Sequence, residues 1–363
     1  MIPNQNRRRF LQTASTLAAA TAWNPGLLCA KPAKPRIKIG QIGVGHAHAA
    51  GKMQIYRELD KDYEVVGIVE PDDKLWAAAS RQKNYQGLER LTRDQLLNTA
   101  GLQAVAVETG VDQLLKHAEA CVDAGLHIHL DKPAGTDMAH YRSIMEKADK
   151  KKRTVQMGYM YRYNPAVLLL QKFLTRGWLG DVFELHTVMS KVVGAGSRKD
   201  LAKFKGGIML ELGCHIIDLA VRVLGRPEKV TPHIRKYGND GLADNMLAVL
   251  DYPGATATVK SSALEVEGFA RRHLAVCGTE GTFHIQPLDR PSASISLGRR
   301  RQDGDLKFEK GVQEIPFQPP YRRYLGDALD FAKIIRGEKG SDFPSAHDLA
   351  VQETVLKASG MME

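Results

Sequence analysis

The segment 207–224, GIMLELGCHIIDLAVRVL, is almost entirely apolar yet carries four ionisable side chains. Glu211, His215, Asp218 and Arg222 recur every three or four residues, so they lie on one stripe if the segment is a helix. Buried charge is costly unless it is paired or used, so the stripe either faces a polar cavity or forms an internal ion-pair network. Histidine is the commonest general base, and Glu211 could hydrogen-bond to His215 and raise its basicity.

A second candidate site is the glycine-rich turn near the start of the chain. The stretch 36–45, RIKIGQIGVG, reads as a buried strand that ends in Gly43 and Gly45, and a helix is expected after it. Glycines at this turn let backbone N–H groups, here those around His46 and Ala47, approach a pyrophosphate at the helix N-terminus. The third position of this dinucleotide fingerprint is His48 rather than Gly or Ala, which is a departure from the pattern.

The second expected strand ends in Glu70, and this residue bears on the choice of nucleotide. A carboxylate at that position can hold both ribose hydroxyls, which favours NAD over NADP. Lys74 and Arg81 follow shortly after and could serve a 2′-phosphate, so NADP is not excluded.

A third candidate site is HIHLDKPAG at 127–135, where Lys132 follows an expected parallel strand. Ligands of open α/β sheets bind at the carboxyl ends of the strands, and Pro133 restricts the chain just beyond the lysine. His127 and His129 share a face of this strand, while His46 and His48 lie near the first turn. A metal site could be drawn from these pairs, but no third ligand has convincing spacing, so we expect packed neutral histidines and no metal.

The elements that must position these groups follow two patterns. Between Arg36 and about Gly158, short β runs alternate with helical runs, which predicts an α/β Rossmann fold with a parallel, doubly wound sheet. After Tyr159 the pattern predicts an antiparallel meander with strands near 182–190, 245–253, 255–267, 271–278, 281–287 and 292–298. Two amphipathic helices are expected at 323–337 and 345–359.

Length and composition fit this division. The 363 residues suggest roughly two domains of about 150 residues each. The formal net charge is +10, and six of the basic residues cluster near the N-terminus: Arg7, Arg8, Arg9, Lys31, Lys34 and Arg36. The remainder is only mildly basic, and the basic runs at 149–153 and 299–301 read as solvated surface, so no nucleic-acid partner is expected.

Residues 1–30 resemble a twin-arginine export signal. Four residues match the usual core Ser-Arg-Arg-x-Phe-Leu-Lys, namely Arg7, Arg8, Phe10 and Leu11. The Ala-rich stretch that follows is less hydrophobic than a membrane span, and Pro25 interrupts it, so no stable membrane anchor is expected. We therefore expect export through the twin-arginine translocase, cleavage near Ala30 and a periplasmic or otherwise exported protein. That route carries folded proteins, which suits a chain whose remaining cysteines, Cys121, Cys214 and Cys277, show no CxxC spacing.

Taken together, the three sites resemble the glucose–fructose oxidoreductase / inositol dehydrogenase (Gfo/Idh/MocA) family. Its Glu-Lys-Pro motif appears as Asp131-Lys132-Pro133. Its Gly-Gly-x-x-x-Asp-x-Gly-x-His-x-x-Asp pattern starts at Gly206-Gly207, with Glu211 in place of the first Asp. Its nucleotide-contacting Thr-Pro turn appears as Thr109-Gly110. The remaining matches, in GYMYRYNP, are Arg162 and Pro165.

The resemblance implies an organisation of domains and a cofactor. After the signal and a linker at 31–35, it implies a Rossmann domain at 36–158 that binds NAD, or NADP. It implies an α+β domain at 159–363 with an open-faced, mainly antiparallel sheet for substrate binding and oligomerisation. The apolar alternation of that sheet suggests a homo-oligomer formed through its uncovered face.

The resemblance also implies roles for single residues. Lys132 would hydrogen-bond the reacting hydroxyl, with a pKa lowered by burial and by the nicotinamide. His215 would accept the hydroxyl proton as hydride leaves the same carbon, and Glu211 would orient His215 or contact the substrate. Asp131 and Pro133 would contact the cofactor with Thr109 and Gly110. Tyr161, Arg162 and Lys205 are the candidates for a sugar pocket.

Three functions are compatible with these residues. The first is an exported NAD(P)-dependent oxidoreductase of a sugar, cyclitol or sugar derivative, which must hold its nucleotide tightly because free cofactor is scarce outside the cytoplasm. The second is an NAD-dependent glycosidase that acts by transient oxidation, elimination and re-reduction, which needs an additional base such as Tyr161 or Glu211. The third is a non-catalytic ligand-binding scaffold, against which Lys132 and His215 argue.

Overall fold

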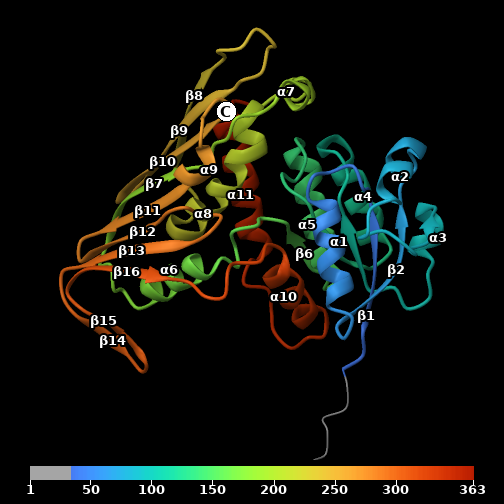
Figure 1. The fold of residues 1–363 in the computed structure, drawn as a ribbon, viewed down its shortest axis with the longest axis horizontal. Coiled ribbons are helices and arrows are strands. Elements are labelled where there is room, and N and C mark those ends of the chain that lie inside the picture. The colour runs from blue at the N-terminus through green and yellow to red at the C-terminus, as the bar shows by residue number, and fades with distance from the viewer. Residues whose placement is uncertain (1–33) are drawn as a thin grey trace, which may run out of the picture. The chain divides into compact units, whose positions relative to one another are not determined.

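The computed structural model describes residues 34–363, so the expected export signal at 1–30 lies outside the described residues. Residues 36–363 form one compact unit, which contains both expected folding patterns (Figure 1). None of the helices in the described part is long and apolar enough to cross a membrane. The three cysteines within it are free thiols.

The N-terminal half is a six-stranded sheet in the order β3-β2-β1-β4-β5-β6, and all its pairs are parallel. Its strands are β1 Ile37–Ile42, β2 Tyr63–Val69, β3 Arg90–Leu91, β4 Ala104–Val107, β5 His127–Leu130 and β6 Val155–Met157. The connecting helices are α1 Ala49–Glu58, α2 Asp73–Ala79, α3 Arg93–Leu97, α4 Val111–Asp123 and α5 Met138–Lys150. The strand order reverses between β1 and β4, which is where such sheets bind ligands. The predicted Rossmann fold is confirmed.

The C-terminal half is an eight-stranded sheet in the order β16-β13-β12-β11-β7-β10-β9-β8. Its strands are β7 Val182–Val188, β8 Lys229–Arg235, β9 Asn245–Tyr252, β10 Ala255–Ser262, β11 His273–Gly278, β12 Gly281–Ile285, β13 Ser292–Leu297 and β16 Gly311–Pro316. A small hairpin, β14 Arg301–Asp303 with β15 Leu306–Phe308, precedes β16. The helices of this half are α6 Pro165–Thr175, α7 Ala195–Ala202, α8 Cys214–Leu224, α9 Gly268–Arg271, α10 Leu325–Ile335 and α11 Ser345–Ala358.

The expected mainly antiparallel sheet is confirmed, and one of its pairs is parallel. Strand β7 is inserted between β11 and β10, and it runs parallel to β10. The helices between β7 and β10 provide the crossover that a parallel pair requires, whereas all other pairs of this sheet are antiparallel. Sequence analysis also missed β8 and β16, because Pro232 interrupts the first and charged residues dilute the alternation of the second.

One face of the C-terminal sheet is covered by helices. Helices α8 and α11 lie against it, and Figure 1 shows them on the same side of the sheet. Side chains that point to this face are buried, as Ala248 and Leu250 are, while their neighbours on the other face, such as Leu247 and Val249, are half-buried. Homo-oligomer formation through the uncovered face stays a prediction.

Helix α10 departs from the expected division of the chain, because it packs on the Rossmann sheet. Ala328, Phe331 and Ala332 share a core with Ile37 and Tyr63. The Tyr63 hydroxyl donates a hydrogen bond of 2.5 Å to the Ala328 carbonyl.

The ionisable stripe does not lie on one regular helix. Residues Met209–Gly213 form a π-helical turn, η1, and α8 continues from Cys214. Gly206 and Gly207 introduce the turn with φ values of +96° and +53°, a region that favours glycine. The extra residue in the π turn rotates Glu211 relative to α8, so the stripe is split between two environments.

We predict that Gly207→Ala destabilises the protein more than an ordinary left-handed glycine substitution. A Cβ at position 207 would lie 2.4 Å from the Ala243 carbonyl oxygen, whereas nothing lies within 4 Å of a Cβ at Gly177, which has φ +62°. Both variants carry strain of about 1 kcal/mol, and the backbone clash should add about 1–3 kcal/mol at position 207. Urea unfolding of both variants measures the difference, and equal losses would contradict the prediction.

Candidate active site

The glycine-rich turn is open for an anionic ligand. Gly43 has φ +90°, and a Cβ there would meet the Glu108 carbonyl oxygen at 2.6 Å, so this turn requires glycine. The backbone N–H groups of Gly45, His46 and Ala47 have no hydrogen-bond partner within the part of the chain that the structure describes. Three free donors at the start of α1 fit a pyrophosphate.

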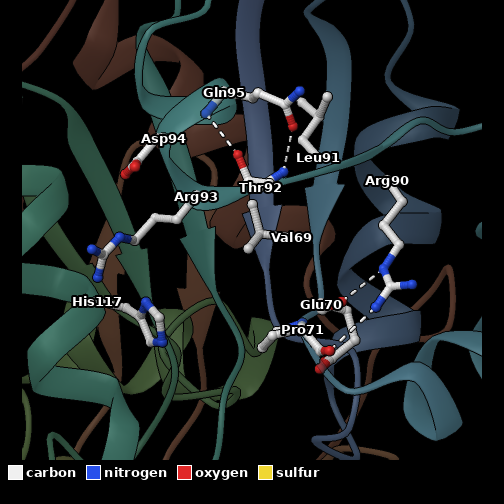
Figure 2. Close-up of a pocket in the computed structure, with 10 residues that line it drawn as sticks. All are labelled: Val69, Glu70, Pro71, Arg90, Leu91, Thr92, Arg93, Asp94, Gln95 and His117. Atoms are coloured by element: carbon white, nitrogen blue, oxygen red, sulfur yellow. Dashed lines mark hydrogen bonds between the residues drawn. The ribbon is translucent and has the colours of Figure 1, made fainter.

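Glu70 lies at the end of β2, beside this turn. Its carboxylate accepts hydrogen bonds from the backbone N–H groups of Val44 (3.1 Å) and Asp72 (3.0 Å). A cavity of about 490 Å³ opens next to it, and its other lining residues include Pro71, Arg90, Arg93 and His117. Figure 2 shows Glu70 and Arg90 on one side of this cavity and Arg93 and His117 on the other. The size and position suit the adenosine half of a dinucleotide.

The basic residues at this cavity differ from those expected. Lys74 and Arg81 are exposed on and just after α2 and do not line it, whereas Arg90 and Arg93 do. Neither arginine could be placed here from the sequence, because β3 is only two residues long and gives no β signal.

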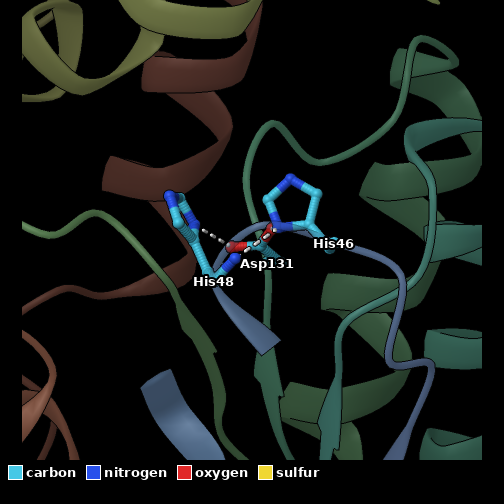
Figure 3. A group of neighbouring side chains, drawn as sticks. All are labelled: His46, His48 and Asp131. Atoms are coloured by element: carbon cyan, nitrogen blue, oxygen red, sulfur yellow. Dashed lines mark hydrogen bonds and ion pairs between the residues drawn. The ribbon is translucent and has the colours of Figure 1, made fainter. Parts of the chain in front are cut away.

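A buried carboxylate, Asp131, connects the turn to the end of β5. Its side chain is fully buried, and Lys52 Nζ donates to its Oδ1 at 3.0 Å. Nδ1 of His48 lies 3.1 Å from Oδ1, and Nδ1 of His46 lies 2.5 Å from Oδ2. Figure 3 shows both imidazoles directed at the carboxylate. Spacing along the sequence offered no third ligand for these histidines, because Asp131 follows a different strand and only the fold brings it beside them.

Lys132, Glu211 and His215 come together at the same edge. Lys132 Nζ donates to the Glu211 carbonyl oxygen at 2.9 Å and lies 3.3 Å from the Glu211 carboxylate. The rings of His215 and His48 have centroids 6.0 Å apart. Lys132 and His215 are each 1% exposed, while the Glu211 side chain is 26% exposed.

The expected pairing of Glu211 with His215 is wrong. The Glu211 carboxylate forms an ion pair with the Lys132 ammonium instead. The buried Nδ1 of His215 has no hydrogen-bond partner within residues 34–363. The π turn explains the difference, because it removes the regular one-turn spacing between the two residues. Glu211 thus positions the lysine and leaves the imidazole free.

The pKa values of the two central groups move in opposite directions. Burial alone would lower the pKa of Lys132, but Glu211, Cys214 and Asp131 outweigh it and raise the pKa above its usual value. The expected fall in the pKa of Lys132 is therefore not produced by the chain's own residues. Burial, Lys132 and His48 hold the pKa of His215 well below 6.5. The site thus presents a protonated ammonium beside a neutral imidazole.

The loop that carries Lys132 is fixed from the far end of the chain. The Gln352 side chain on α11 accepts a hydrogen bond from the Ala134 N–H (3.1 Å) and donates one to the Gly135 carbonyl (2.8 Å). Thr109 and Gly110 follow β4, the strand paired with β5, and Gly110 caps α4 without a side chain. Nothing in the local sequence marks Gln352 for this role.

Of the expected pocket residues, Tyr161 lies nearest to the centre. Its ring centroid is 6.0 Å from that of His215, and its hydroxyl donates to Asp289 Oδ2 at 3.1 Å. Arg272 Nη1 lies 3.0 Å from Asp289, and Arg323 also contacts this carboxylate. Sequence analysis missed these three charged residues. Lys205 is exposed in the turn before Gly206.

Arg162 does not line a pocket as expected. Its guanidinium is completely buried, lies 2.6 Å from Asp218 and also contacts Asp348. Arg222, the last residue of the stripe, donates to the Arg162 carbonyl oxygen at 2.7 Å. Asp218 thus belongs to an internal ion-pair network, and Arg222 is hydrogen-bonded to the backbone beside it, while Glu211 and His215 face the site.

Family models match both halves of the chain. The model of the oxidoreductase family with an NAD-binding Rossmann fold, GFO_IDH_MocA, matches residues 37–159, and the GFO/IDH/MocA C-terminal domain model matches residues 167–284. The chain belongs to this family. It is therefore an oxidoreductase of the Gfo/Idh/MocA type with an NAD-binding domain, as the sequence motifs predicted.

The chain is also similar to curated dehydrogenases, and its fold is similar to that of solved structures. Inositol 2-dehydrogenase of Rhizobium meliloti is 26% identical over 266 residues, which cover 71% of this chain and 77% of the relative. The scyllo-inositol 2-dehydrogenase (NAD⁺) of Bacillus subtilis is 26% identical over 74% of this chain and 78% of its own. The structure of levoglucosan dehydrogenase in complex with NADH and levoglucosan superposes with a TM-score of 0.76 at 17% identity, covering 90% of this chain and 98% of that one.

We predict that Asp218→Ala lowers the free energy of unfolding by about 3–5 kcal/mol, because it leaves the buried Arg162 guanidinium with one carboxylate. Asp200→Ala, at a side chain that is 72% exposed, should change it by less than about 0.5 kcal/mol. Burial would raise the pKa of Asp218, but Arg162 and His347 hold it at about 2. Because the folded pKa is the lower one, this stabilisation is present above about pH 4 and lost as the pH falls toward 2. Urea unfolding at several pH values measures both effects, and equal losses in the two variants would refute the assignment.

Proposed function

We propose that the chain catalyses hydride transfer between a tightly held nicotinamide nucleotide and a sugar, cyclitol or sugar derivative. The observation that carries this is the meeting of the Lys132 ammonium and the His215 imidazole beside the glycine-rich turn. The names of the inositol and levoglucosan dehydrogenases support a polyhydroxylated substrate. Glu70 supports NAD over NADP, because its carboxylate would repel a 2′-phosphate.

The chain's own residues would divide the work at one hydroxyl. Lys132 stays protonated and donates a hydrogen bond to the substrate oxygen, and Glu211 holds its ammonium in place. His215 stays neutral and accepts the hydroxyl proton while hydride leaves the same carbon. Nicotinamide supplies the hydride acceptor when it is bound. Tyr161 and Glu211 would line the substrate side of the site.

The contacts of Tyr161 and Glu211 favour this proposal over the glycosidase. The Tyr161 hydroxyl is engaged by Asp289, and burial and Asp289 raise its pKa. Glu211 is engaged by Lys132. Neither group is therefore a free base for elimination next to the sugar.

We also propose that the protein is exported through the twin-arginine translocase, on the basis of Arg7, Arg8, Phe10 and Leu11. An exported redox enzyme needs a retained nucleotide, which links the two proposals. Sequencing the N-terminus of protein recovered from the periplasm should find a mature chain that begins near Lys31. Recovery of a chain that starts at Met1, in the cytoplasm, would refute export.

We predict that His215→Ala and Lys132→Ala each lower kcat by about 10²–10⁴-fold, because each removes a group that handles the reacting proton or oxygen. Lys333→Ala, at an exposed lysine of α10, should leave kcat unchanged. The purified protein is denatured and its released nucleotide identified by mass spectrometry, and sugars and cyclitols are then screened as substrates. About one NAD per chain is expected.

Release of no nucleotide, together with no binding of added NAD or NADP, would overturn the proposed function. Full turnover in His215→Ala would leave the nucleotide site standing and refute the role of the imidazole. Nucleotide content measured for each variant separates a loss of chemistry from a loss of cofactor.

A further inference from the structure

We propose that His46, His48 and Asp131 form a binding site for one divalent transition-metal ion. The three residues come from the turn after β1, the start of α1 and the end of β5. One ligand atom from each lies within 4.8 Å of the others. Two imidazoles and one carboxylate are a donor set typical of zinc or iron rather than magnesium or calcium.

The state of the Asp131 carboxylate is the observation that points to a cation. Lys52 and His48 contact Oδ1, whereas the fully buried Oδ2 has no hydrogen-bond partner within the described residues. Nδ1 of His46 lies 2.5 Å from Oδ2 and forms an ion pair with it when the imidazole is protonated. A buried carboxylate oxygen and an imidazole nitrogen that face each other at this distance are a pair of ligand atoms that one metal ion can bridge.

The charges around the carboxylate are compatible with a cation. Lys52 is shared with Glu108, at 2.8 Å, and Lys132 lies on Glu211. Lys52 binds only one Asp131 oxygen, so it can act as the outer partner that orients a carboxylate ligand.

Partial exposure gives an ion access to the site. The side chains of His46 and His48 are each 15% exposed, while Asp131 is closed on all sides. The three protein ligands would thus bind the ion from the buried side, and water or another oxygen ligand would bind it from the exposed side.

A second group of possible ligands, Asp218, His347 and Asp348, does not offer the same chemistry. Both of its carboxylates form ion pairs with the buried Arg162 guanidinium, which compensates their negative charge. Oδ2 of Asp348 also has no hydrogen-bond partner within the described residues, so the second group differs from the first in its buried arginine and in offering one imidazole instead of two.

The site depends on His48, which stands where the dinucleotide fingerprint has a small residue. A Gly or Ala at this position would remove one of the two imidazoles. Metal binding rests on these side chains alone and does not require the proposed redox function.

The test is metal binding by the full-length protein. The protein is freed of metal with a chelator, and Zn²⁺ and Co²⁺ are titrated separately by calorimetry and by visible absorption. One ion per chain is expected. His46→Gln and His48→Gln should each weaken binding about tenfold or more, because each removes a direct ligand. His186→Gln, on the open sheet, and His347→Gln, in the second group, should leave the affinity unchanged.

X-ray absorption at the zinc edge of the wild-type protein provides a measurement that needs no variant. Scattering from two imidazoles is expected. No stoichiometric binding by the wild type, unchanged affinity in the His46→Gln/His48→Gln double variant, or a zinc shell without imidazole would each overturn the proposal. Nucleotide content is measured on the same samples, so a failed metal site and a failed nucleotide site give different results.

Discussion

The buried Arg162 guanidinium is the interaction on which the geometry of the site depends. It joins three segments that are far apart in the chain, because it follows the last Rossmann strand and binds Asp218 on α8 and Asp348 on α11. An uncompensated charge in this position would be costly, so the three segments are held in one relative placement. His215 lies one turn before Asp218 on α8, and Gln352 lies one turn after Asp348 on α11. The network therefore fixes the position of the His215 imidazole and of the loop that carries Lys132.

Most of the fold could be predicted from the sequence, because alternating β and helical runs determine a parallel sheet and its ligand edge. The sites at Gly43, Lys132 and His215 could be found for the same reason, since each lies at a recognisable end or stripe. The pairing of charges could not be predicted. Regular helix spacing predicted a contact between the side chains of Glu211 and His215. The π turn after Gly207 rotates the Glu211 side chain, and its carboxylate contacts Lys132 instead.

Residues with no local pattern were missed altogether. Lys52 and Glu108 meet across 56 residues, and Arg272 and Asp289 meet on loops of the C-terminal half. Such pairs are decided by which strands become neighbours, and parallel neighbours are separated by a helix in the sequence. Asp131 shows the same limit, because its two histidine partners belong to a different βα unit.

The packing of α10 has a consequence for the modularity of the chain. Phe331 and Ala328 complete a core whose other members include Ile37, Ile39 and Tyr63. The segment that completes the nucleotide-binding lobe is therefore synthesised after the whole C-terminal sheet. A fragment that ends near residue 158 would expose that apolar surface, so the Rossmann lobe cannot be exchanged between proteins as a simple N-terminal block. The core of the lobe is complete only after α10 has packed onto it, and this couples formation of the nucleotide site to the folding of the C-terminal half.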